Sequence, residues 1–147
     1  MQNKLKDFLA KKGYTKIKLK LTKTNHFEVK AKINNVKGTF ILDTGASKSC
    51  VDINASNIFL MKTKKSSIKI SGASGAEMKT KKSKKNRIKI GQWNGQGIKL
   101  VLIDLSQINT ALKKQNAKPV QGIIGADILK KANGIIDYKK QKLYLKF

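Results

Sequence analysis

The sequence predicts a mostly β fold formed by one domain of 147 residues. Polar residues, mostly lysine, alternate with apolar residues along residues 17–21 and 26–33, which is the period of a half-buried strand. Two further apolar runs, at residues 40–42 and 98–103, are typical of strands that are covered on both faces. A chain of this length can bury a core of its own, so we expect a single domain spanning residues 1–147.

A short amphipathic helix is expected near the N-terminus, because Leu5, Phe8 and Leu9 recur at helical spacing and Gly13 can end the helix. The first residues contain no apolar run of the signal-peptide type. No segment approaches the ~20 apolar residues of a membrane span. We therefore expect a soluble, cytoplasmic protein with no membrane partner.

The apolar run at residues 40–42 leads directly into a carboxylate, Asp43. This run is the second arm of a hairpin whose turn signal is the Asn pair at residues 34–35. The end of a buried strand is an unfavourable place for an ionisable group. Thr44 and Gly45 let the backbone turn sharply and provide a hydroxyl and N–H groups that can orient the carboxylate.

Residues 40–47, Phe-Ile-Leu-Asp-Thr-Gly-Ala-Ser, resemble the signature of the retropepsin-like aspartic proteases, in which Asp-Thr-Gly carries the catalytic carboxylate. A plain Asp-Thr-Gly turn is the alternative interpretation. Residues 122–129, Gly-Ile-Ile-Gly-Ala-Asp-Ile-Leu, are similar to the later segment that packs beneath the Asp-Thr-Gly loop in this family. The resemblance spans residues 15–147 and leaves the N-terminal helix of residues 1–13 outside it.

The resemblance implies a retropepsin-like closed β-barrel lobe with short helices, and two such lobes in a homodimer. The chain contains one Asp-Thr-Gly, so a catalytic pair would take one Asp43 from each subunit. The implied activity is that of an aspartic endopeptidase acting on a peptide or protein substrate, without a cofactor or a metal. The alternative is a non-catalytic binding module of the same fold, whose basic surface holds an acidic partner or nucleic acid.

Two sets of residues are expected to complete the site around Asp43. The resemblance assigns active-site support to Thr44, Gly45, Ala46, Ile123, Ile124 and Gly125, and assigns the flap that closes over bound peptide to Gly72, Ala73, Ser74 and Gly75. For the flap residues, the alternative is a simple surface hairpin.

The net charge of +25 invites a nucleic-acid interpretation, but the type and spread of the basic residues favour a solvated surface. Only Arg87 of the 33 basic residues is an arginine, the residue best suited to bidentate phosphate and base contacts. The stretch at residues 79–89 is too densely charged to fold inward, and we expect its first part to be a mobile return from the flap. Residues 88–90 then begin a strand, and residues 91–97 form a turn that contains Trp93.

The remaining segments predict short elements. These are a strand at residues 49–51, a brief helix or irregular turn at 54–61, a strand at 68–71, a helix capped by Ser106 and running to about Gln115, and closing strands at 134–138 and 142–145.

Other titratable residues compete with Asp43 for a catalytic role. Asp127 is interpreted as an N-cap or first-turn residue of a helix, and Asp104 and Asp137 as turn residues. A Cys-His hydrolase built on Cys50 and His26 is disfavoured, because Cys50 lies in a strand where a buried, inert thiol is expected. One cysteine excludes an internal disulfide, and one Cys with one His cannot form a structural zinc site.

Overall fold

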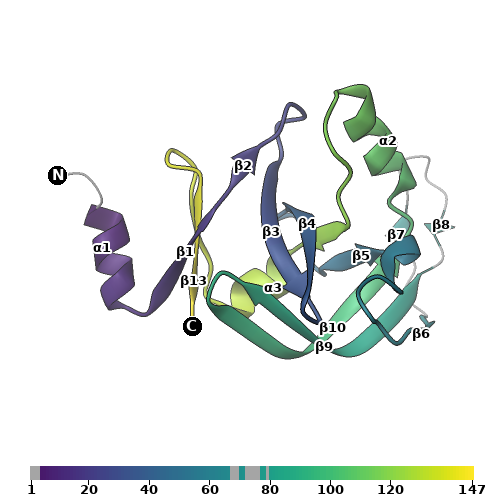
Figure 1. Cartoon of the computed structure of the whole chain (residues 1–147), viewed down its shortest axis with the longest axis horizontal. Coiled ribbons are helices and arrows are strands. Elements are labelled where there is room, and N and C mark those ends of the chain that lie inside the picture. Colours follow the sequence, from purple (N-terminus) through teal and green to yellow (C-terminus); the bar gives the residue numbers. More distant parts are fainter. Residues whose placement is uncertain (1–3, 67–69, 72–76, 79) are drawn as a thin grey trace.

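The computed structural model describes residues 4–66, 70–71, 77–78 and 80–147. The chain is mostly β, as predicted, with short helices between the strands (Figure 1). Its elements are α1 (Lys4–Lys11), β1 (Tyr14–Lys18), β2 (Lys20–Leu21), β3 (Phe27–Ile33), β4 (Val36–Leu42), β5 (Cys50–Asp52), the 3-10 helix η1 (Ile53–Ala55), β6 (Lys64–Lys65), β7 (Ile70–Ser71), β8 (Glu77–Met78), β9 (Lys81–Ile90), β10 (Trp93–Ile103), α2 (Ser106–Lys114), β11 (Gly122–Ile124), α3 (Ala126–Lys131), β12 (Ile135–Asp137) and β13 (Lys142–Lys146).

Six strands close into a barrel in the order β3-β4-β11-β5-β10-β9, and β9 pairs back onto β3. The strands β2 and β6 extend this sheet at either side. Phe40, Phe59, Ile88 and Leu102 are among the fully buried side chains of its core, and the rings of Phe40 and Phe59 lie 6.0 Å apart. Closure removes the exposed sheet edges that these six strands would otherwise present.

The hairpin that precedes Asp43 forms as the sequence predicts. The strands β3 and β4 pair antiparallel from Phe27 opposite Leu42 to Ile33 opposite Val36. Only the two asparagines separate the strands, and both have positive φ, 49° at Asn34 and 73° at Asn35. This is the backbone that a two-residue hairpin needs, and asparagine tolerates it better than most residues do.

The prediction for the basic stretch was wrong. Residues 81–90 form the long strand β9, which pairs with β10 on one side and with β3 and β6 on the other. Residues 88–90 therefore end a strand rather than begin one, and Trp93 is a buried residue of β10 rather than part of a turn. The turn between the two strands contains only residues 91–92. Lys79 lies outside the described residues.

Buried polar residues explain why such a charged segment can form part of the barrel wall. Along β9 the lysines stay at least partly exposed, while Ser83 and Asn86 face inward with the apolar residues that follow them. The Asn86 amide donates to Ser83 Oγ at 3.1 Å and to Ile98 O at 3.2 Å, and its Oδ1 accepts from Asn34 Nδ2 at 3.0 Å. Each buried polar group is thereby paired, so burial is not penalised.

A second sheet, in the order β1-β13-β12, lies between the barrel and α1 (Figure 1). The predicted strand at residues 17–21 is divided between the two sheets. The strand β1 pairs with β13 up to Lys18, and the N–H of Leu19 donates to Gln141 O in the same register, whereas Lys20 and Leu21 pair with β3. The predicted helix at the N-terminus is confirmed as α1, and Gly13 follows it with φ of +86°. None of the helices in the described part of the chain has the length and apolarity needed to cross a membrane.

The Asn86 network gives a direct test of the barrel wall. We expect Asn86→Ala to lower the free energy of unfolding by about 2 kcal/mol, because Ile98 O and the Asn34 amide would lose their buried partner. Lys84→Ala is the matched control on the same strand, since Lys84 is exposed and its change should stay within about 0.5 kcal/mol. Urea denaturation of both variants measures the difference, and equal stability would contradict this role of Asn86.

Candidate active site

Asp43 follows the last residue of β4 and begins a tight turn. Its N–H donates to Ile124 O at 3.0 Å, which continues the pairing of β4 with β11. Its Oδ1 accepts from the N–H of Gly45 at 2.9 Å, and its backbone carbonyl accepts from the N–H of Ala46 at 3.2 Å. The turn therefore fixes both the position of the carboxylate and its orientation, as expected for Thr44-Gly45.

The strand β11 supports the Asp43 turn by pairing with β4. It is parallel to β4, with Ile124 opposite Leu42, and antiparallel to β5, with Gly122 opposite Val51. It thus lies between two strands that are close together in the sequence, although it is about eighty residues later. A Cβ on Gly122 would collide with the carbonyl oxygen of Cys50, so the close approach of β11 and β5 requires glycine here.

The segment after β11 is bonded directly to the Asp43 turn. The N–H of Ala126, in the first turn of α3, donates to Ala46 O at 2.7 Å. A side chain on Gly125 would place its Cβ 2.5 Å from the same oxygen. The structure therefore brings together the predicted support residues Thr44, Gly45, Ala46, Ile123, Ile124 and Gly125 at the joined ends of β4 and β11.

A clamp between Ser49 and Asp127 was not anticipated from the sequence. Both carboxylate oxygens of Asp127 accept from the N–H of Ser49 at 3.0 Å, and Oδ1 also accepts from Ser49 Oγ at 2.7 Å. Ser49 Oγ in turn accepts from the N–H of Gly125 at 2.8 Å. Asp127 does lie in the first turn of α3, as predicted, but its main contacts are made 78 residues away along the chain. No local pattern signals such a pair.

In the single chain, Asp43, Thr44 and Gly45 are exposed. Asp43 and Thr44 line a cavity of about 450 Å³, whose apolar wall includes Leu21, Ile136 and Tyr138. Thr44 also borders a second hollow of about 470 Å³, which it shares with Ile136. The turn thus lies between two open, partly apolar depressions rather than inside a closed pocket.

The structure separates His26 from Cys50. His26 lines the same cavity as Asp43, and its Nδ1 lies 3.0 Å from Thr24 Oγ1. Cys50 is buried in a cluster with apolar residues of β10, and burial raises the pKa of its thiol to about 12. The thiol is therefore protonated at neutral pH and is a poor nucleophile. The placement of His26 beside the Asp43 cavity was not foreseen from the sequence.

The other candidate acids lie at the ends of strands: Asp104 follows β10, and Asp137 is the last residue of β12. Asp104 Oδ1 accepts from the N–H of Ser106 at 2.9 Å, and this bond lowers the pKa of the Asp104 carboxyl. The prediction that Ser106 caps this helix was wrong: Leu105 is at the N-cap without a side-chain bond, and Ser106 is the first residue of α2, its N–H bonded to Asp104. Asp137 Oδ1 accepts from the N–H of Lys140 in the turn after β12.

Two further expectations concern the flap and a metal site. The predicted flap residues Gly72, Ala73, Ser74 and Gly75 lie outside the described residues, although β7 and β8 on either side of them pair antiparallel. Within the described residues, His, Cys, Asp and Glu side chains form no group of three or more that could hold a metal ion.

A sequence model of the family described as Aspartyl protease matches residues 29–128, from β3 into α3. The chain belongs to this aspartyl protease family. The matched residues include both the Asp43 turn and the β11 segment beneath it. No curated protein matches the sequence.

Solved structures support a retropepsin-like fold for this family member. A retropepsin-like aspartic protease from Rickettsia conorii superposes with a TM-score of 0.59 at 20% identity, covering 90% of this chain and 89% of that chain. The retroviral protease-like domain of Ddi1 from Leishmania major gives 0.57 at 17%, with 86% and 90% covered. The EIAV protease in complex with the inhibitor HBY-793 gives 0.55 at 22%, with 75% and 90% covered. At these identities the similarity establishes the fold alone.

The Ser49–Asp127 clamp can be tested by stability. We expect Ser49→Ala to lower the free energy of unfolding by about 2–3 kcal/mol, because it removes a buried hydroxyl bonded to a carboxylate and to the N–H of Gly125. Ser47→Ala, in the same loop but exposed, is the control and should change little. Chemical denaturation measures both, and similar small effects would show that the clamp does not stabilise the loop.

Proposed function

We propose that this family member is an aspartic endopeptidase that acts as a homodimer, with one Asp43 from each subunit forming the catalytic pair. The observation behind the proposal is the placement of Asp43, a carboxylate at the exposed end of a buried strand that is oriented by the N–H of Gly45. Each chain contains one Asp-Thr-Gly, so each chain can supply one such carboxylate. Membership of the aspartyl protease family supports the reaction class.

The proposed reaction needs two carboxyl groups around one water molecule. Two such groups at close range cannot both ionise, so the pair holds one proton. The ionised Asp43 takes a proton from the water as it attacks the peptide carbonyl, while the protonated Asp43 donates a hydrogen bond to the carbonyl oxygen. The proton is then passed to the leaving nitrogen. The apparent pKa values of this reaction belong to the pair and not to either residue.

The surface around Asp43 supports pairing with a second copy of the chain. Leu21 and Tyr138, which line the Asp43 cavity, are 44% and 68% exposed. The strand β12 is at the end of its sheet and contributes Ile136 to both depressions beside Thr44. An apolar rim and a sheet edge beside a polar turn are favourable places for a two-fold contact.

A non-catalytic binding module is the second candidate, and the net charge of +25 is the observation that favours it. The same barrel would then present a basic surface to an acidic or nucleic-acid partner while the Asp43 pair stayed unused. The two functions differ in what Asp43 does, so variants of this residue distinguish them.

Asp43→Asn is the decisive variant. We expect it to abolish cleavage of a pooled peptide library while the fold and the dimer persist, because asparagine has nearly the same shape and removes the like-charge repulsion of the pair. Asp104→Asn, which changes an exposed carboxylate in a turn, is the control and should keep its activity. Equal activity in wild type and Asp43→Asn would falsify the assignment, and a wild type without activity would favour the binding module.

The pH profile provides an independent check of the shared proton. Cleavage should peak in the acidic to mildly acidic range and decline on both sides. The pair of carboxyl groups gains a second proton below the optimum and loses its single proton above it. A statine-type inhibitor, whose hydroxyl replaces the attacking water, should block cleavage. Activity that rises steadily to alkaline pH would contradict the carboxylate mechanism.

Thr44→Val tests the proposed dimer axis. Thr44 is exposed beside Asp43, and we expect its hydroxyl to donate a hydrogen bond to the partner subunit. Valine keeps the shape and removes the donor, so dissociation of the dimer should increase by about tenfold without unfolding the monomer. Sedimentation equilibrium measures this change, with Thr63→Val on an exposed loop as the control. An unchanged dissociation constant would place Thr44 outside the interface.

A further inference from the structure

A second region of interest lies away from Asp43, in a cavity on the outer side of the β3–β4 hairpin. It has a volume of about 670 Å³ and is lined by residues of β3, β4 and β9 together with Gly91 and Gln121. Four of these residues are lysines, and we call the cavity the lysine groove. Its lysines are Lys30, Lys32, Lys37 and Lys89.

Three of these lysines are directly opposite one another across adjacent strands. Lys32 on β3 is paired in register with Lys37 on β4 and with Lys89 on β9. Neighbouring strands are ~4.8 Å apart, and like charges directly opposite each other destabilise a sheet. Single pairs of opposed lysines also occur elsewhere, at Lys18–Lys142, Lys64–Lys82 and Lys65–Lys81. Among the strand pairs of the described residues, only Lys32 is opposite two other lysines.

The row has no acidic counterpart among the described residues. The residues that line the groove include no Asp or Glu, and none of its lysines forms an ion pair within the described chain. Lys30 Nζ donates instead to the neutral Thr39 Oγ1, at 2.7 Å. Glu28, two residues before Lys30 on the same strand, is buried and does not pair with it. The positive charge of the groove is therefore unbalanced.

The floor of the groove is suited to a close-fitting ligand. Apart from the lysines, its lining residues are Thr39, Gln121 and small alanine and glycine residues. Gln121 Oε1 accepts from the N–H of Thr39 at 2.7 Å, which leaves the amide NH₂ of Gln121 as an additional donor. A smaller hollow of about 70 Å³ that includes Arg87 shares Lys32 and Lys89 with the groove, so the positive surface continues beyond it.

We propose that the lysine groove binds an acidic segment of a polypeptide. The side chains on one face of an extended peptide repeat every two residues, and Lys30 and Lys32 are separated by the same repeat on β3. Alternate carboxylates of an extended acidic segment therefore match these two lysines. Nucleic acid fits less well, because the described lining residues include no aromatic ring for base stacking and no arginine.

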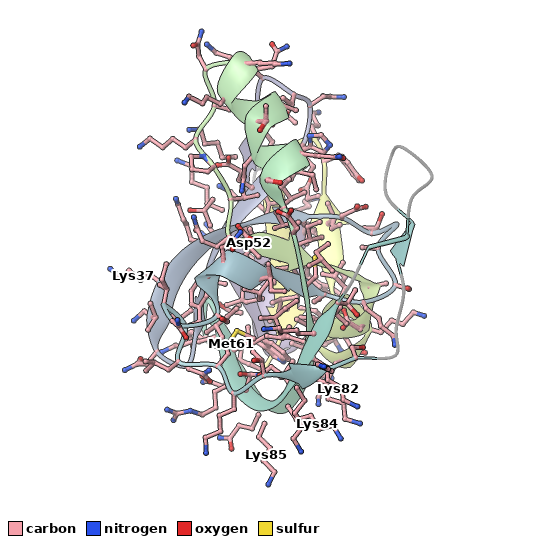
Figure 2. The ribbon with its side chains drawn as sticks, turned by 90° about the vertical axis from the view of Figure 1, so that its right-hand side faces the viewer. Lys37, Asp52, Met61, Lys82, Lys84 and Lys85 are labelled. Carbon is pink, nitrogen blue, oxygen red and sulfur yellow. The ribbon has the colours of Figure 1, made fainter. Side chains whose placement is uncertain are left out.

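Two triple variants with equal loss of charge test the proposal. The first is Lys32→Gln/Lys37→Gln/Lys89→Gln, which removes the row. The second is Lys82→Gln/Lys84→Gln/Lys85→Gln on β9, whose side chains project away from Lys37 (Figure 2). Because the first variant removes like-charge repulsion, we expect it to be at least as stable as wild type. If it does not fold, the single variants Lys32→Gln and Lys84→Gln replace the two triples.

The measurement is fluorescence anisotropy of a labelled Glu-Ser repeat peptide of about twelve residues, with a Gln-Ser peptide and an oligothymidine of similar length as competitors for the same assay. At an ionic strength of about 0.15 M, the groove variant should bind the Glu-Ser peptide about tenfold more weakly than wild type, and the β9 variant within about twofold. If both variants lost the same affinity for the Glu-Ser peptide, binding would depend on the overall charge of the protein and not on the groove, and the proposal would be overturned. Tighter, groove-dependent binding of oligothymidine, or no binding of the acidic peptide to wild type, would overturn it as well.

Discussion

The structure depends on the insertion of β11 between β4 and β5. Asp43 can leave the barrel in a defined direction only because its N–H has a partner in Ile124 O, and Ala46 O has one in the N–H of Ala126. Without β11 these backbone groups would be unpaired at the rim of the core, which is costly. The Asp43 turn is therefore not a local structure. It forms when two halves of the chain, about eighty residues apart, have assembled, and long-range pairing of this kind slows folding.

The same arrangement leaves the Asp43 carboxylate of one chain open to solvent. The barrel buries residues 40–42 and then releases the carboxylate into solvent, so a single chain provides orientation but not a water-excluding environment. In the proposed dimer the second copy would supply the other carboxyl and cover the apolar rim. Rigid support from one chain and enclosure by another are separate requirements, and the Ser49–Asp127 clamp meets only the first.

Sequence patterns could predict the parts of the fold that depend on neighbouring residues. The β3–β4 hairpin, its Asn34-Asn35 turn and the order of the two family segments are all local signals. The strand β9 was missed because the density of its lysines hides a burial pattern that relies on Ser83 and Asn86, two polar residues that only tertiary contacts can satisfy. The Ser49–Asp127 clamp and the register of Lys32 with Lys89 depend on pairs far apart in the chain, so no short window contains them.

One hairpin fixes the relation between the Asp43 turn and the lysine groove. Lys37 is in β4, and Asp43 follows the last residue of that strand, six residues later. A strand rises about 3.4 Å per residue. Lys37 and Asp43 are thus ~20 Å apart along a strand that is paired with β3 throughout and with β11 from Phe40 to Leu42. Lys30 is opposite Thr39, four residues before Asp43, so a polypeptide that filled both places would need at least about four extended residues between the carboxylate at Lys30 and the bond beside Asp43. The register of β4, rather than any flexible element, therefore sets the spacing between the basic surface and the aspartate.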